Sequence, residues 1–162
     1  MLKVPARFLF GIFFLMISPA SKSIGQTAAD SEVDQGVRRM ADAIVRDLHD
    51  VGPVSWLKYF SRSGHFFMAS NGQLAFANYD SADAFVHTFA KSIRQIDLTW
   101  ENIRIDSLGP RLAVLAASFN EVLTAATGKQ DTSAGYFTGV AEYVDGGWKL
   151  RDAHWSIDNT KQ

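Results

Sequence analysis

The sequence predicts an α+β fold: a cone-shaped roll in which a strongly curved antiparallel β-sheet wraps around three N-terminal helices. Three observations support this prediction. Apolar residues recur at helical spacing in the first half of the chain, and they alternate with period two from Asp97 onward. Asp145-Gly146 stands where a tight turn is needed between the last two strands. Because helices here precede long strands, we expect them to cover one face of the sheet.

The first 25 residues have the pattern of a cleavable signal peptide. Basic residues precede the apolar run 8–17, and small residues follow it. The run is too short to span a bilayer, which takes about 20 residues. We therefore expect cleavage after Ala20 or Gly25 and export to the periplasm or the medium. A single domain over residues 26–162 would follow, and it would contact a membrane only through an uncleaved signal segment.

Three helices are expected before Asp97. The first covers 31–50, with Ser31 as its N-cap and Gly52-Pro53 ending it. A short second helix fits 54–60, and the third begins near Ser81. The predicted buried stripes are Val33, Val37, Met40, Ala41, Ile44, Val45 and Leu48 on the first helix, and Ala82, Phe85, Phe89, Ile93 and Ile96 on the third.

Strands are expected on both sides of the third helix. A hairpin of 65–69 and 74–77 turns at Asn71-Gly72, and four long strands cover 98–105 with a possible bulge, 111–126, 136–144 and 148–157. Both faces of the strand 111–126 are largely apolar, so one face of the sheet needs a cover other than the helices. Strong curvature or dimerisation across the outer sheet face would provide it.

These elements in this order resemble the nuclear transport factor two superfamily, in its SnoaL-like and ketosteroid-isomerase-like branches. The residues that carry the resemblance are Ser55-Trp-Leu-Lys-Tyr-Phe60, Asn71-Gly72, and Asp145-Gly-Gly-Trp-Lys-Leu followed by His154-Trp-Ser156. The resemblance covers residues 30–157. It implies a pocket at the open end of the cone for a small apolar or aromatic molecule, and a homodimer through the outer sheet face. It implies no single chemistry, since the superfamily contains isomerases, dehydratases, cyclases, and binding or assembly modules.

The last strand is predicted to form the inner wall of the cone. A two-residue turn at Asp145-Gly146 would put Trp148, Leu150, Asp152, His154 and Ser156 on one face. His154 could contact a ligand, transfer a proton, or be held by a backbone carbonyl or by Asp152. A serine, a histidine and an aspartate spaced about 7 Å apart on one straight strand do not form a hydrolytic triad.

Other candidate residues come from the second helix and the middle strands. Trp56 and Tyr59 are expected near the mouth or floor of the cone. Of the neighbours Asn120 and Glu121, only one can face inward, and Asn120 is preferred because it shares a face with Leu112, Val114 and Ser118. The predicted ligand-binding set is Trp56, Tyr59, Asn120, Phe137, Asp152, His154 and Ser156, with His154 the best catalytic candidate.

Composition excludes several classes of site. The chain has no cysteine, which rules out disulfides, thiolate nucleophiles and zinc–thiolate sites. Its formal net charge is −1 and its basic residues are scattered, unlike those of a nucleic-acid-binding protein. His65 and His154 lack a carboxylate at metal-ligand spacing, so neither a metal nor another cofactor is expected.

Three functions remain open from the sequence. The first is an exported binding or assembly module that holds a ligand in the cone without assured catalysis. The second is an isomerase or lyase in which His154 transfers a proton on a small carbonyl compound. The third is a structural protein whose pocket is filled by Phe66, Phe67, Phe119 and Phe137.

Overall fold

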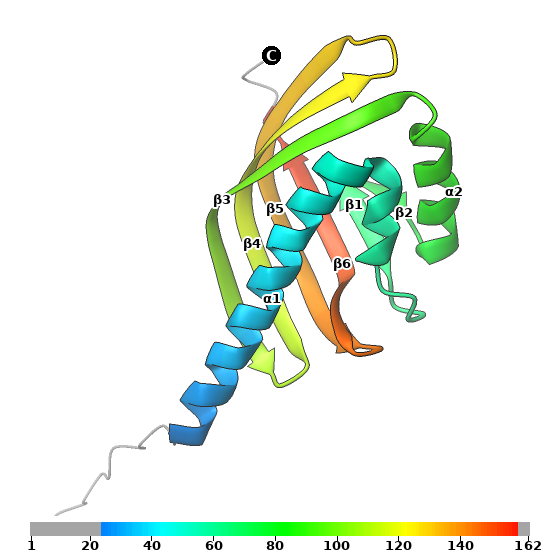
Figure 1. Ribbon diagram of the computed structural model, residues 1–162. Helices are drawn as coiled ribbons and strands as arrows, with labels where there is room; N and C mark the ends of the chain where they lie inside the picture. Colours follow the sequence, from blue (N-terminus) through cyan, green and yellow to red (C-terminus); the bar gives the residue numbers. More distant parts are fainter. Residues whose placement is uncertain (1–23, 159–162) are drawn as a thin grey trace, which may run out of the picture.

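The computed structural model describes residues 24–158; residues 1–23 and 159–162, with nearly all of the predicted signal peptide, lie outside them. Its elements are α1 (Ile24–Val51), the 3₁₀ helix η1 (Pro53–Lys58), β1 (Phe67–Ser70), β2 (Gln73–Phe76), α2 (Tyr79–Phe89), β3 (Ile93–Gly109), β4 (Leu112–Ala125), β5 (Gln130–Val144) and β6 (Gly147–Ile157). The predicted α+β class is confirmed: helices precede a curved sheet of six strands that does not close (Figure 1).

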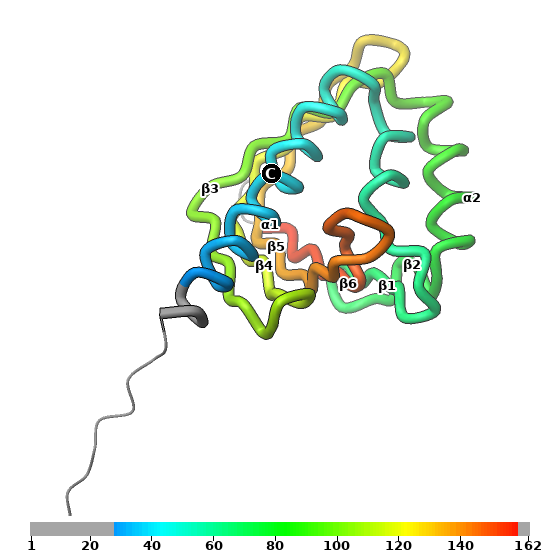
Figure 2. The backbone as a smooth tube through the Cα atoms, turned by 60° about the horizontal axis from the view of Figure 1, so that its bottom comes forward, coloured from blue at the N-terminus to red at the C-terminus, as the bar shows by residue number. Residues whose placement is uncertain are grey.

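The strands follow the order β2-β1-β6-β5-β4-β3. All neighbours are antiparallel except β1 and β6, which run parallel, so the prediction of a wholly antiparallel sheet is wrong at this one pair. β1 runs parallel because it enters the sheet along an edge of β6, the strand farthest from it in sequence. α1 crosses the concave side of the sheet, and α2 lies beyond η1 (Figure 2).

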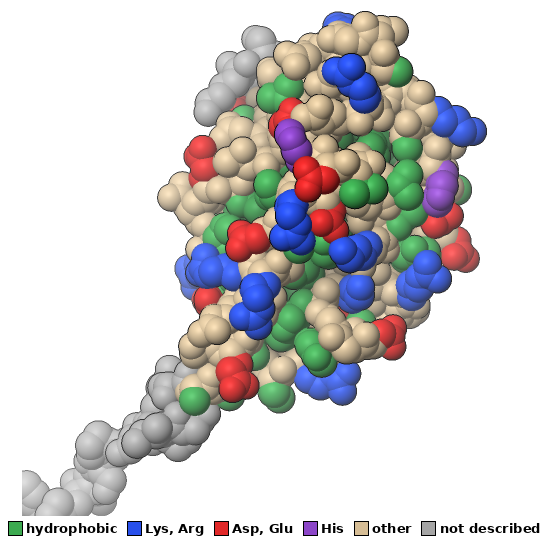
Figure 3. Space-filling model, viewed as in Figure 1, with side chains coloured by type: hydrophobic (Ala, Val, Ile, Leu, Met, Phe, Trp, Pro, Cys, Tyr) green, Lys and Arg blue, Asp and Glu red, His purple; other side chains and the backbone are tan. Residues whose placement is uncertain are grey.

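The apolar stripe predicted for α1 is confirmed. Val37, Ala41 and Leu48 are fully buried against the sheet. Gly52, with φ of 89°, ends the helix after Val51, and its N–H donates to the Leu48 carbonyl oxygen. Each buried aliphatic side chain of this size contributes about 1.5–3 kcal/mol. The helix begins at Ile24, so Ser31 lies inside it and is not the N-cap. Basic and acidic side chains are interspersed along the exposed side of α1 (Figure 3).

α2 begins earlier and ends sooner than predicted. Its N-cap is Asn78, whose side-chain oxygen accepts the Ser81 amide N–H at 2.9 Å, so Ser81 is the third helical residue. Val86 is buried, whereas the predicted core residue Phe85 is 49% exposed. Ile93 and Ile96 belong to β3, not to the helix, because they pair with β4.

Both predicted turns and the bulge are confirmed. Asn71-Gly72 and Asp145-Gly146 have positive φ angles at both residues, as a two-residue hairpin turn of this type requires. The β3–β4 register shifts between Glu101 and Arg104, and Asn102 has φ of 53° there. This bulge lies in the bent part of the sheet.

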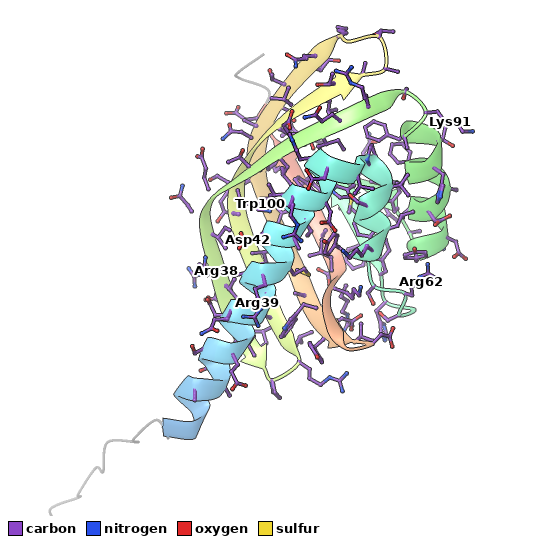
Figure 4. All side chains as sticks on the ribbon, viewed as in Figure 1. Arg38, Arg39, Asp42, Arg62, Lys91 and Trp100 are labelled. Carbon is purple, nitrogen blue, oxygen red and sulfur yellow. The ribbon has the colours of Figure 1, made fainter. Side chains whose placement is uncertain are left out.

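Two tryptophans hold α1 on the sheet. The Trp100 indole N–H donates to the Ala41 carbonyl oxygen at 3.2 Å, which places Trp100 between α1 and the strands (Figure 4). Trp148 lies across Gly36, where a Cβ atom would overlap the indole ring. Only glycine at position 36 allows this close approach.

The carboxylate of Asp47 ties α1 to η1. The Lys58 Nζ and the Tyr59 hydroxyl donate to Asp47 Oδ2 at 2.7 and 2.6 Å. These two hydrogen bonds, from Lys58 first and then Tyr59, lower the pKa of Asp47 to about 2. Tyr59 is only 5% exposed, so its hydroxyl forms this hydrogen bond to Asp47 and does not make the predicted ligand contact.

Replacing Asp47 by Asn is expected to lower the free energy of unfolding at pH 7 by about 1 kcal/mol, a figure reduced for solvent screening. Because the folded pKa lies below the unfolded value, the stabilisation is complete above about pH 4 and is lost as the pH falls through about 2. Urea unfolding of both proteins between pH 7 and pH 2 measures it. Asp42→Asn, at an exposed position of the same helix, is the control. A difference between wild type and Asp47→Asn that is as large at pH 2 as at pH 7 would contradict the assignment.

Candidate functional site

A cavity opens on the concave side of the sheet, between the β1–β2 hairpin and the inner faces of β4, β5 and β6. Its volume is about 180 Å³. Most of its wall is apolar, and three polar side chains reach it. The lining residues are Trp56, Met68, Ala75, Phe76, Phe119, Trp155 and Ile157, with Ser70, Glu121 and Ser133. This combination of an apolar wall and a few polar groups is typical of small-molecule sites.

Glu121 is the single ionisable residue of this wall. It faces inward on β4, opposite Leu98 of β3 and Ser133 of β5. The Ser133 hydroxyl donates to Glu121 Oε1 across a long 3.3 Å. Burial raises the pKa of Glu121, and the hydrogen bond from Ser133 only partly opposes this effect. The carboxyl group is therefore easier to protonate than one in water.

Trp155 forms the centre of the aromatic wall. Its ring stacks on Trp56 at 5.8 Å and on Trp100 at 5.6 Å, with interplanar angles of 24° and 26°. Phe119 and Phe137 meet it in T-shaped contacts at 4.8 and 4.7 Å. The buried indole N–H of Trp155 has no hydrogen-bond partner among the residues that the structure describes. An unpaired buried donor costs about 1–3 kcal/mol, so this ring position is maintained by packing.

The placement of Asp152, His154 and Ser156 inside the cone is wrong. The turn at Asp145-Gly146 has two residues as predicted, but the β5–β6 register shifts between Val140 and Ala141, so that Leu150 pairs with Ala141 and Asp152 with Val140. Arg151 is the extra residue of a β-bulge, which reverses the faces of everything after it. Ala153, Trp155 and Ile157 therefore face inward.

The three polar residues lie on the outer, convex face instead. His154 is exposed, and Asp152 is half-buried beside it, where burial raises its pKa. Both border a shallow outer hollow of about 200 Å³. Because the sheet separates His154 from the inner cavity, this histidine cannot transfer a proton there.

Asn120 also faces outward, contrary to the prediction. It is exposed, and its side-chain amide donates to Glu101 Oε1 at 2.9 Å. With Ser156 and Tyr136 it borders an outer hollow of about 380 Å³. This hollow is larger than the inner cavity, but its wall is mainly polar and lacks the tryptophan lining of the inner cavity, so the inner cavity is the better candidate site.

Two more predicted site residues lie near the cavity. Trp56 lines it, as the sequence predicts. Phe137 is fully buried and packs behind Trp155, so it supports the wall without lining it. The sequence interpretation preferred Asn120 to Glu121. Glu121 lies on the same face of β4 as Ala117 and Phe119.

A second carboxylate, that of Glu142 near the end of β5, has a structural role. The hydroxyls of Ser61 and Ser63 both donate to Glu142 Oε1, the latter at 2.7 Å. Burial alone would raise the pKa of Glu142, but these hydrogen bonds lower it below its usual value. Ser61 is fully buried, so the cluster fixes the segment before β1.

Within residues 24–158, no group of three His, Asp or Glu side chains is placed to hold a metal ion. Over the same residues, no helix is both long and apolar enough to cross a membrane.

Comparisons with known proteins identify the fold. No protein-family model and no curated protein match the chain. A protein of Novosphingobium aromaticivorans provisionally named a scytalone dehydratase superposes with a TM-score of 0.71 at 15% identity, over 82% of this chain and 88% of that one. A nuclear transport factor 2-like protein of Salmonella enterica gives 0.62 at 16%, over 82% and 92%. A hexachlorocyclohexane dehydrochlorinase gives 0.65 at 8%, over 82% and 89%. This chain has the nuclear transport factor 2-like fold.

Proposed function

We propose that this protein binds a small, largely apolar molecule in the inner cavity, with Glu121 as its hydrogen-bonding group. The observation that carries the proposal is a half-buried carboxyl group in a cavity walled by Trp56, Phe119 and Trp155. Carboxyl groups whose pKa is raised by burial in a cleft cluster at functional sites. The similar structures support a ligand-binding or enzymatic cone domain.

The interior does not fill its own cavity, which weighs against a purely structural protein. Phe66, Phe119 and Phe137 are buried in the core as expected, yet about 180 Å³ stays open beside them. Phe67 is 44% exposed on the outer face and takes no part in filling the cone.

An isomerase or lyase activity is the second candidate. Its proton-transfer group would be Glu121 rather than His154, because only Glu121 reaches the cavity. A raised pKa brings a carboxyl group closer to the pH at which it can both accept and donate a proton. Glu121→Gln would then abolish turnover while leaving binding intact.

We further propose that the mature protein is exported and forms a homodimer through the outer face of the sheet. No described helix covers this face, and Phe67 and Tyr136 on it are 44% and 48% exposed. A second copy would cover these aromatic side chains.

Native mass spectrometry of the protein purified from its own host tests these proposals together. We expect an N-terminus at Ser21 or Gln26, a dimer mass, and an additional bound mass. The bound mass should be lost in Ala75→Phe, which fills the cavity, and kept in Ala77→Phe, two residues away and outside the lining. A bound mass that survives Ala75→Phe, or no bound mass from any preparation, would overturn the binding proposal.

A further inference from the structure

The volume of the cavity limits the size of its ligand. A cavity of about 150 Å³ with aliphatic and aromatic walls accommodates benzene in another protein. The volume of about 180 Å³ therefore admits one six-membered ring with one short substituent. A two-ring compound exceeds this volume, so its second ring would remain at the open mouth of the cavity and bury less apolar surface.

The charges around the cavity disfavour an anion. No Lys, Arg or His is among its lining residues, so a bound anion would have no counter-charge. It would also face Glu121, whose neighbours across the sheet are Leu98 and Ser133. Burying an unpaired charge costs far more than burying a neutral polar group that forms a hydrogen bond.

The orientation of the rings disfavours a cation. A cation binds over the face of an aromatic ring, where the electron density is negative. Trp155 stacks on both Trp56 and Trp100, so other rings cover the faces of its own indole that a cation would need. Phe119 and Trp155 meet in a T-shaped contact, which also uses a ring face. Exposed ring edges carry positive potential and attract the face of a further ring or an acceptor atom.

The hydrogen bond to Glu121 indicates which group the ligand presents. Ser133 donates to Oε1, so Oε1 acts as an acceptor and Oε2 is the oxygen left to meet a ligand. When protonated, Oε2 donates to an acceptor such as an amide oxygen, and when ionised it accepts from a donor such as an amide N–H. Burial, which raises the pKa of Glu121, favours this protonated form.

From this geometry we infer that the cavity selects an uncharged single-ring aromatic compound with one polar group, such as an amide, that hydrogen-bonds to Glu121. The inference rests on the proposed binding function and narrows it to one class of ligand. Within this class, the ring fills the apolar part of the cavity and the polar group meets the one acid on the wall.

Three probes of equal size and different charge test the inference at pH 7: benzamide, benzoate and benzylammonium. Binding is followed by the fluorescence of the cavity tryptophans and by ligand-observed NMR. We expect benzamide to bind at least about tenfold more tightly than either charged probe, which corresponds to about 1.4 kcal/mol. 2-Naphthamide, with a second ring, should bind at least about tenfold more weakly than benzamide.

Variants at position 121 separate the hydrogen bond from the charge. Glu121→Gln keeps an uncharged donor and should retain benzamide binding, whereas Glu121→Leu should weaken it by about tenfold. Glu101→Gln, on the outer face, is the matched control and should match wild type.

The outcomes distinguish this inference from the binding function itself. If benzylammonium binds tightest and Glu121→Gln abolishes its binding, the site is a cation site and the inferred class is wrong, while the binding function stands. Tightest binding of benzoate would refute the class in the same way. If no probe binds but Ala75→Phe releases a native ligand, the inferred class of ligand is wrong and the binding function stands. If no probe binds and no native ligand exists, both proposals fail.

Discussion

Replacing Phe137 by Ala is expected to lower the free energy of unfolding by about 3–5 kcal/mol. Phe137 is fully buried on β5, and its ring contacts Trp100 at 5.2 Å and Trp155 at 4.7 Å. Truncation leaves a hole between α1 and the sheet that neither large indole can fill. Equilibrium urea unfolding, followed by tryptophan fluorescence, measures the effect.

Tyr136→Ala is the matched control for this prediction. Tyr136 is the preceding residue of the same strand, but its side chain lies on the outer face and is 48% exposed. At protein concentrations low enough for the monomer, its removal should change stability by no more than about 0.5 kcal/mol. Equal losses in the two variants would mean that the inner and outer faces of β5 have been assigned incorrectly.

Gly135→Ala is expected to destabilise the protein by about 1–3 kcal/mol, although it adds only one methyl group. A Cβ atom at position 135 would overlap the Ser156 carbonyl oxygen and come within 3.0 Å of the Ile157 Cα. These are backbone atoms of the neighbouring strand β6, so they cannot move aside without disrupting the ladder. Thermal unfolding of the variant and wild type measures the difference.

A second glycine provides the comparison. Gly64 lies in the loop before β1, and a Cβ atom there would meet nothing within 4 Å. Gly64→Ala should therefore be neutral, or stabilising by up to about 1 kcal/mol through the unfolded state. If Gly135→Ala also proved neutral, the close approach of β6 to β5 at this point would be refuted.

Helices, hairpins and fold class were predictable because they depend on local patterns. The stripe on α1 repeats with the helical period, and both tight turns carry the residues that positive φ angles favour. The superposed structures agree with the fold that the resemblance implied.

The inner face of β6 was not predicted, because a β-bulge changes which alternate residues face inward without changing the composition of the strand. A signal for it exists in the sequence. Leu150 has the parity of Trp148, whereas the apolar residues Ala153, Trp155 and Ile157 have the opposite one. A strand whose apolar positions change parity midway must either expose one set or contain an extra residue. The structure contains the extra residue at Arg151.

The inner face of β4 presented a different difficulty. Leu112, Val114 and Ala116 on one face are as apolar as Ala113, Leu115 and Ala117 on the other. Which face the helices cover is decided by contacts with α1, which is distant in sequence. The polar residues at the end of the strand follow that choice, so Glu121 turns inward and Asn120 outward.

The parallel pairing of β1 with β6 affects how this protein folds. One wall of the cavity comes from the hairpin that follows η1, and the opposite wall includes the last strand of the chain. Contacts between segments so far apart in sequence form late, because a long loop must close first. A nascent chain that ends before β6 therefore has no cavity at all. A ligand can therefore stabilise only chains in which β6 has paired with β1.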